Sequence, residues 1–94
     1  MVEEMSEKGS LTIKVFTLKT CPNCPTAKKI AREVAEKSNV RFMEIDVGTP
    51  EGQIEGLMYQ VMSTPSIALD EEVLARGEVL TKEELEKKVR EKLG

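Results

Sequence analysis

Two cysteines, Cys21 and Cys24, are the residues of this 94-residue chain whose type and spacing point most clearly to chemistry. A thiolate attacks disulfides and binds soft metal ions, so a C-x-x-C pair can exchange with a disulfide or contribute to a metal site. A bond across so short a loop would stabilise the fold little, which favours catalysis or metal binding over a structural role. The chain contains no histidine, and this excludes Cys–His and Ser–His–Asp catalysis and histidine-ligated metals.

The elements that flank the cysteines predict which of them reacts first. Residues 11–18 show the alternation of a strand whose second half is buried. After the motif, apolar residues follow a helical spacing at Ala27, Ile30, Ala31, Val34 and Ala35. The N-terminus of a helix stabilises an anion, and cysteines placed there have pKa values lowered to about 3.5–7.5. We therefore expect Cys21 to attack as a thiolate and Cys24, one turn into the helix and pointing inward, to resolve the mixed disulfide.

Two other interpretations of the cysteine pair stay open. The first is a pair of chemically inert cysteines, which would not need a strand-to-helix junction or the flanking Pro22 and Pro25. We expect one of these two prolines to cost a helix hydrogen bond. A zinc or iron–sulfur site needs about four ligands, so metal or cluster binding through Cys21 and Cys24 would require a dimer or outside ligands.

The middle of the chain predicts a strand and a short helix. The first helix ends near Asn39, and residues 40–47 form a second strand, which completes a βαβ unit with parallel strands. Thr49 as N-cap and Pro50 at the first helical position begin the next helix. Its apolar face consists of Ile54, Leu57, Met58 and Val61. Two glycines weaken this helix, so we expect it to be short.

The last third predicts an antiparallel hairpin and a capped helix. Residues 67–69 and 73–75 are short apolar runs around a charged turn. Residues 81–84 form a capping box, and the apolar stripe of the helix continues through Leu85, Val89 and Leu93. The order β-α-β-α-β-β-α therefore predicts an α/β domain over residues 11–94, with a mixed sheet and helices on both faces. Residues 1–10 are expected to be a disordered or frayed leader.

Composition and charge narrow the function classes. The net charge is −3 and no basic block occurs, so a nucleic-acid partner has little support. No apolar run approaches the roughly 18 residues that span a bilayer. The first ten residues are polar and acidic, without the apolar core of a signal peptide, so we expect a cytoplasmic protein.

These features resemble the thioredoxin/glutaredoxin family, above all the small archaeal-type proteins with a glutaredoxin-sized fold and thioredoxin-like activity. The resemblance covers residues 11–93, and its markers are F-T-L-K-T-C-P-N-C-P-T-A-K-K at 16–29, the strand 40–47 and S-T-P-S-I at 63–67. It implies a thioredoxin-like fold with a four-stranded mixed sheet and a thiol–disulfide oxidoreductase acting in electron transport and cell redox homeostasis. No cofactor other than the redox-active disulfide, and no metal, is implied.

The resemblance also implies partners and a substrate surface. The partners are disulfide-containing protein substrates and a dithiol or flavin-dependent reductase, and we expect a monomer. The peptide bond before Pro65 would be cis, and the backbone of Thr64 would bind a substrate peptide. The expected substrate-binding residues are Thr20, Pro22, Asn23, Thr64 and Pro65.

Three departures from the family pattern bear on mechanism. Thr20 stands where thioredoxins carry a tryptophan, and Val15 stands where they keep a buried acid that takes a proton from the resolving cysteine. Residues 76–79 have one glycine instead of the Gly-Gly turn with which glutaredoxins bind glutathione. A glutathione-linked glutaredoxin is the alternative function.

Overall fold

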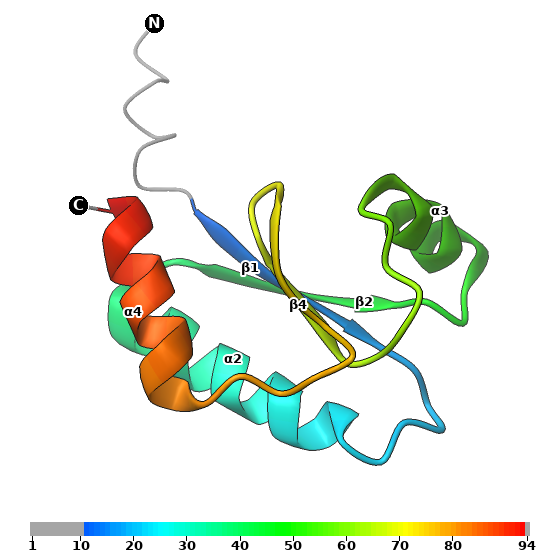
Figure 1. Cartoon of the computed structure of the whole chain (residues 1–94), viewed down its shortest axis with the longest axis horizontal. Helices are drawn as coiled ribbons and strands as arrows, with labels where there is room; N and C mark the ends of the chain where they lie inside the picture. Colours follow the sequence, from blue (N-terminus) through cyan, green and yellow to red (C-terminus); the bar gives the residue numbers. More distant parts are fainter. Residues whose placement is uncertain (1–10, 94) are drawn as a thin grey trace, which may run out of the picture.

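The computed structural model describes residues 11–93, so the predicted leader at 1–10 lies outside the described residues. The elements are β1 (Thr12–Thr17), α2 (Cys24–Ser38), β2 (Arg41–Asp46), α3 (Pro50–Met58), β3 (Ser66–Leu69), β4 (Glu72–Arg76) and α4 (Lys82–Leu93). They form one sheet in the order β2-β1-β3-β4, with β2 parallel to β1 and the other neighbours antiparallel (Figure 1). The predicted α/β class, element order and four-stranded mixed sheet are confirmed.

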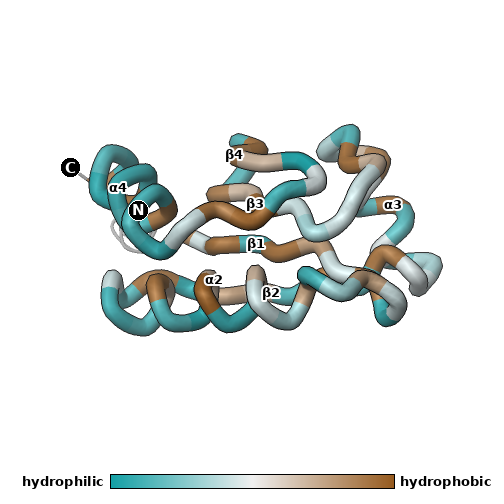
Figure 2. The backbone as a smooth tube through the Cα atoms, turned by 60° about the horizontal axis from the view of Figure 1, so that its bottom comes forward, coloured by the Kyte–Doolittle hydropathy of each residue, from teal (hydrophilic) through white to brown (hydrophobic). Residues whose placement is uncertain are grey.

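One face of the sheet is covered by α2 and α4. The apolar stretches of β1 and β3 lie at the centre of the molecule, and α2 turns its hydrophobic side toward them (Figure 2). The buried cluster on this face consists of Ile13, Val15, Ala27, Ala31, Val34, Ala35, Ile67, Leu69, Leu85 and Val89. The predicted stripe of α2 is thus confirmed, with Ile30 half-buried at its edge. In α4 the stripe ends at Val89, because Leu93 in the last turn is 46% exposed.

The opposite face is covered by α3 and holds a smaller cluster. Phe16, Ile45, Val61 and Ala68 are its buried members. The ring of Tyr59 lies 5.4 Å from that of Phe16, and its hydroxyl accepts a hydrogen bond from Lys14 Nζ. Lys14 therefore extends to the α3 face of the sheet, away from the cysteines.

The orientation of α3 contradicts the packing that its apolar stripe suggests. Its buried residues are Gly52 and Gly56, whereas Ile54, Leu57 and Met58 point outward and are more than half exposed. A Cβ atom at Gly52 would overlap the carbonyl oxygen of Asp46, so this helix approaches the end of β2 closer than any side chain permits.

The helix ends follow the predicted caps. Thr49 Oγ1 accepts a hydrogen bond from Gly52 N at 3.0 Å, and α3 is a short helix of nine residues. Thr81 and Glu84 form the reciprocal capping box, with both N···O distances at 3.1 Å. Helix α2 ends with Asn39 in the left-handed region, at φ 61°. These caps fix where each helix begins and ends relative to the sheet.

Candidate active site

Cys21 and Cys24 form a disulfide across the junction between β1 and α2, with their Cα atoms 5.4 Å apart. Cys21 lies in the loop, where its N–H donates to the carbonyl of Leu18 at 3.0 Å. Cys24 is the first residue of α2, so it lies at the start of the helix and not one turn inside it as the sequence suggested. The two cysteines are thus close enough to form a disulfide when oxidised and to separate as two thiols when reduced.

The two cysteines differ in their access to solvent. Cys24 is 4% exposed, whereas Cys21 is half-buried and is flanked by the exposed Thr20, Pro22 and Asn23. These exposed residues leave the Cys21 side of the pair open to a large molecule. The geometry therefore makes Cys21 the accessible sulfur and Cys24 the internal one.

The first turn of α2 leaves its backbone N–H groups without a side-chain cap. Asn23 is the N-cap residue, and its side chain makes no cap hydrogen bond. Pro25 occupies the first helical turn, where a missing N–H costs nothing, and Pro22 precedes the helix. The expectation that one proline would cost a helix hydrogen bond is therefore wrong. The N-terminus of α2 is open to a negative charge on Cys21.

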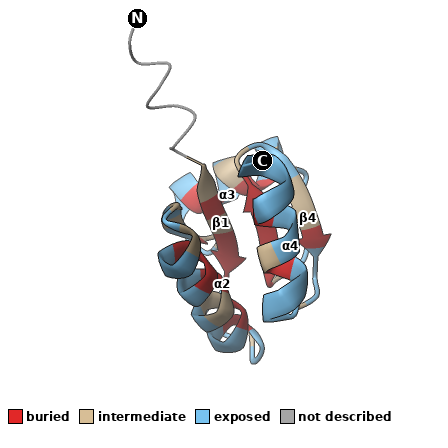
Figure 3. Cartoon of the chain, turned by 90° about the vertical axis from the view of Figure 1, so that its left-hand side faces the viewer, coloured by how far each residue is buried: buried red, intermediate tan, exposed pale blue. Residues whose placement is uncertain are grey.

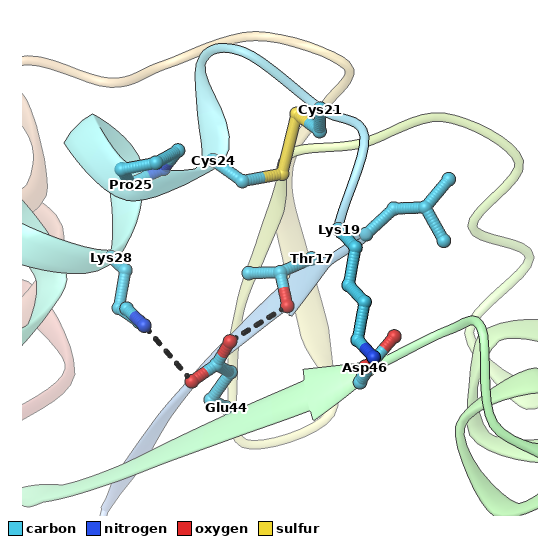
Figure 4. A pocket seen from close by; sticks show the side chains of 9 residues that line it. Thr17, Lys19, Cys21, Cys24, Pro25, Lys28, Glu44 and Asp46 are labelled. Carbon is cyan, nitrogen blue, oxygen red and sulfur yellow. Dashed lines mark hydrogen bonds and ion pairs between the residues drawn. A yellow bond between two sulfur atoms is a disulfide. The ribbon is translucent and has the colours of Figure 1, made fainter.

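A cleft of about 220 Å³ lies beside the disulfide and reaches to the sheet below it. Its lining consists of Thr17, Leu18, Lys19, Cys21, Cys24, Pro25, Lys28, Glu44 and Asp46. The cleft joins the cysteines to the ends of β1 and β2 and to the first turns of α2 (Figure 4).

A polar group at the floor of this cleft was missed by the sequence analysis. The buried Thr17 hydroxyl donates to Glu44 Oε2 at 2.9 Å, and Lys28 Nζ lies 3.4 Å from Glu44 Oε1. Figure 4 shows Thr17 and Glu44 below the disulfide, with Lys28 reaching down from α2. The strand alternation of residues 40–47 could have revealed Glu44, because it shares a face of β2 with the half-buried Phe42.

The position that the buried acid occupies in thioredoxins holds an apolar side chain in this chain. Val15 is fully buried and belongs to the core between β1 and α2. It cannot accept a proton. Glu44 on the neighbouring strand places a carboxylate in the cleft that Cys24 lines.

The Thr64–Pro65 peptide bond is cis, and it directly precedes β3. Phe16 pairs with Ser66 in the antiparallel ladder, which places Thr64 and Pro65 beside the end of β1 that leads to Cys21. Pro65 is buried, whereas Thr64 is half-buried. The structure thus brings this segment to the same end of the sheet as the cysteine loop.

Gly77 fixes the loop around Pro65, a role that the sequence analysis did not assign to it. Its N–H donates to Pro65 O at 2.9 Å and lies 3.3 Å from Ser66 Oγ. Its φ is +78°, and a Cβ atom there would lie 2.9 Å from Ser63 Cβ. The sequence does show a lone glycine directly after a strand. Its hydrogen-bond partner, Pro65, lies twelve residues upstream, so only the fold reveals the contact.

Within residues 11–93 no group of three or more histidine, cysteine, aspartate or glutamate side chains could hold a metal ion. In the same range no helix combines the length and the apolar character that a membrane crossing requires.

Comparison with known proteins identifies the family. The model of the thioredoxin domain matches residues 11–90. A probable thioredoxin of Archaeoglobus fulgidus is 34% identical over 65 residues, which are 69% of this chain and 71% of the relative. A thioredoxin of Methanocaldococcus jannaschii is 30% identical over 85 residues, which are 90% of this chain and 99% of the relative.

Solved structures share the fold at low sequence identity. A mutant thioredoxin from Halobacterium salinarum superposes with a TM-score of 0.78 at 18% identity, covering 99% of this chain and 83% of that protein. Chloroplastic thioredoxin z gives a TM-score of 0.74 at 18% identity, covering 96% of this chain and 84% of that protein. Thioredoxins use no cofactor beyond their redox-active cysteines, and the Cys21–Cys24 disulfide is such a pair. The chain belongs to the thioredoxin family of thiol–disulfide oxidoreductases.

Proposed function

We propose that this protein reduces disulfides of other proteins, with Cys21 as the attacking nucleophile and Cys24 as the resolving thiol. The observation that carries the proposal is the asymmetry of the pair, since Cys21 is half-buried in the loop before α2 whereas Cys24, the first residue of α2, is 4% exposed. The macrodipole of α2, whose first turn has no side-chain cap, favours the thiolate form of Cys21.

The reaction proceeds in two exchanges. Cys21 Sγ attacks one sulfur of the substrate disulfide, a Cys21–substrate bond forms, and the other substrate sulfur leaves as a thiolate. Cys24 then loses its proton and attacks Cys21 Sγ, which releases the second substrate thiolate and forms the Cys21–Cys24 disulfide. Two electrons pass from the dithiol to the substrate, and a reductase returns them in the next cycle.

Glu44 is the proposed acceptor of the Cys24 proton. It lines the same cleft as Cys24, and Thr17 and Lys28 hold both of its carboxylate oxygens. This arrangement would supply from β2 the base that Val15 on β1 cannot provide.

The substrate surface is proposed to consist of the residues around the accessible sulfur. Thr20, Pro22 and Asn23 are assigned to this surface because they are exposed around Cys21. Thr64 and Pro65 are assigned to it because they lie at the same end of the sheet. Thr64 lies two residues before Ser66, the first residue of β3, and its backbone is proposed to pair with an extended substrate segment.

We also propose a cytoplasmic, monomeric protein that is recharged by a dithiol or flavin-dependent reductase and binds no nucleic acid. Both cysteines belong to the redox pair, which leaves none for the structural disulfides that are common in small secreted domains. The net charge of −3 does not favour a nucleic-acid partner.

Trapping the mixed disulfide tests the assigned roles. Cys24→Ser should accumulate a covalent adduct with a disulfide-bearing protein, because no thiol remains to resolve the Cys21 bond. Cys21→Ser should form no such adduct and should lose dithiol-dependent reduction of insulin. Mass spectrometry of the non-reduced products identifies the bonded cysteine, and an adduct through Cys24 with Cys21→Ser still active would reverse the roles.

A further inference from the structure

Ser66, the first residue of β3, carries a buried hydroxyl that the proposed reaction does not use. It is 0% exposed, and the other buried polar residue of the described chain is Thr17. A buried hydroxyl costs free energy unless it is hydrogen-bonded. The Ser66 hydroxyl donates to Ser63 O at 2.6 Å and accepts from Gly77 N at 3.3 Å. Ser66 therefore joins the loop before β3 to the loop after β4.

These contacts anchor the chain on both sides of Thr64. On one side, the Ser66 hydroxyl holds the carbonyl of Ser63. On the other side, the N–H of Gly77 donates to the carbonyl of Pro65 at 2.9 Å. Pro65 itself has no N–H to donate, so it cannot add a bond of its own. A side chain, that of Ser66, thus supplies the anchor on the near side of Thr64.

Thr64, the residue between these anchors, has an unpaired backbone. Among the described residues, neither its N–H nor its C=O has a hydrogen-bond partner. The pairing of Phe16 with Ser66 places Thr64 beside the end of β1 that leads to the cysteine loop (Figure 1). An anchored segment with an unused donor and acceptor can add an extended segment of another chain by strand-like pairing. The precision of that pairing depends on how firmly the neighbouring peptide units are held.

The hydrogen bond of Ser66 acts directly on the Thr64 N–H. This N–H and the carbonyl of Ser63 belong to one planar peptide unit, which is trans because the cis bond is the following one. In a trans unit the C=O and the N–H point in opposite directions. Holding Ser63 O toward Ser66 therefore directs the Thr64 N–H away from Ser66. Without this bond the peptide unit is free to rotate, and the N–H loses its fixed direction.

We propose that Ser66 is a positioning residue for substrate binding, whose hydroxyl orients the backbone of Thr64 through the carbonyl of Ser63. This inference rests on the proposed function and adds to it the buried side chain that sets the geometry of the substrate surface. Ser66 is fully buried and touches no substrate, so it acts only through the loop. Loss of its hydroxyl should weaken the binding of protein disulfides and leave the chemistry at Cys21 unchanged.

Ser66→Ala tests this role with two substrates, insulin and a small aromatic disulfide. kcat and KM are measured for insulin at saturating dithiol, and the second-order rate of the pre-reduced protein is measured with the small disulfide. Ser66→Ala should raise KM for insulin about threefold to tenfold, the effect of one neutral hydrogen bond, and leave kcat within about twofold. The small disulfide has no backbone to pair with Thr64, so its rate should equal that of the wild-type chain.

Two further variants separate positioning from stability. Ser66→Thr keeps the hydroxyl but adds a methyl group at a fully buried site, so it should unfold at lower urea and still keep the wild-type KM. Ser38→Ala is the control for loss of a serine hydroxyl, because Ser38 is at the opposite end of α2 from Cys24, and it should match the wild-type chain with both substrates. A KM that follows the urea midpoint instead of the hydroxyl would show that Ser66 only stabilises the fold.

Each outcome separates the inference from the function on which it rests. If Ser66→Ala keeps the wild-type KM for insulin, the positioning role is wrong and the proposed function stands. If Ser66→Ala slows the reaction with both substrates in the same proportion, the substitution disturbs the redox pair and the positioning role is overturned. If the wild-type chain reduces neither substrate, the proposed function itself fails.

Discussion

The two faces of the sheet are covered in opposite ways. On one face, α2 and α4 present alanine, valine and leucine side chains to β1 and β3, and these side chains are almost fully buried. On the other face, α3 presents glycines inward and leaves its large apolar side chains in solvent. Figure 3 shows the buried residues concentrated between α2, the strands and α4.

The two faces therefore contribute unequally to stability. The α2/α4 face holds most of the buried apolar surface and therefore most of the hydrophobic stabilisation. The α3 face contributes a smaller cluster around Phe16. The redox pair lies at the start of α2, the helix that packs on the more extensively buried face.

The largest expected effect is the loss of a core side chain on the α2/α4 face. Leu85→Ala should lower the free energy of unfolding by about 2–5 kcal/mol, because this fully buried leucine would leave a cavity. Leu57→Ala removes the same atoms from a side chain that is 72% exposed and should change stability by less than about 0.5 kcal/mol. Urea unfolding measures both, and equal losses would contradict the contrast between the faces.

The inward glycines of α3 provide the next test. Gly52→Ala should destabilise the protein by about 1–3 kcal/mol, since the new methyl group would collide with the carbonyl of Asp46. Gly56→Ala is the matched control, because its Cβ would lie 3.6 Å from Val61 O and 3.7 Å from Val47 Cγ1, an ordinary contact distance. Alanine there should stabilise α3 by up to about 1 kcal/mol. Thermal unfolding that ranks the two variants the other way would exclude the packing described for this helix.

Substitution at Gly77 should affect both stability and activity. Gly77→Ala forces a Cβ into a left-handed backbone conformation and against Ser63, at a cost of about 1–2 kcal/mol. Because Gly77 N–H binds Pro65 O, the variant should also reduce protein disulfides more slowly. Insulin reduction assays alongside urea unfolding measure the two effects. Unchanged values in both would show that the Pro65 loop does not depend on this contact.

The smallest expected effect concerns the proton acceptor in the cleft. Glu44→Gln keeps the shape of the side chain but removes the carboxylate, and it should slow resolution of the mixed disulfide about threefold to tenfold. This is less than the usual general-base contribution, because the cleft also admits water. Stopped-flow release of the second substrate thiol isolates this step, and Glu44→Asp should partly restore it. A Glu44→Gln variant that resolves the mixed disulfide at the wild-type rate would remove Glu44 from the mechanism.

Local signals in the sequence were sufficient for the elements. The α2 stripe, the Thr49 cap and the Thr81–Glu84 capping box depend on residues within a few positions of one another, and the structure has each of them. The orientation of α3 was not predictable in this way. Periodicity identifies an apolar stripe, but it does not show that a close approach to Asp46 turns the glycines inward instead.

In the site, too, the features that depend on neighbouring residues could be predicted and the contacts between distant residues could not. The cysteine pair and its position before a helix could be predicted, because the motif and the helix pattern are adjacent in the chain. The Glu44–Thr17 hydrogen bond and the Gly77–Pro65 contact join residues 27 and 12 positions apart. Such contacts depend on strand order and register, which a single sequence specifies only through the whole fold.

The equilibrium reduction potential of the Cys21–Cys24 pair tests the central claim most directly. The protein is equilibrated in dithiol and glutathione buffers of graded potential, and free thiols are alkylated and counted by mass spectrometry. Both thiols should disappear together in one reversible two-electron transition, between about −270 and −200 mV, the range of thioredoxins and glutaredoxins. If the thiols remain alkylatable across this range, or oxidise only into intermolecular dimers, the pair is not a redox centre and the proposed reaction is wrong.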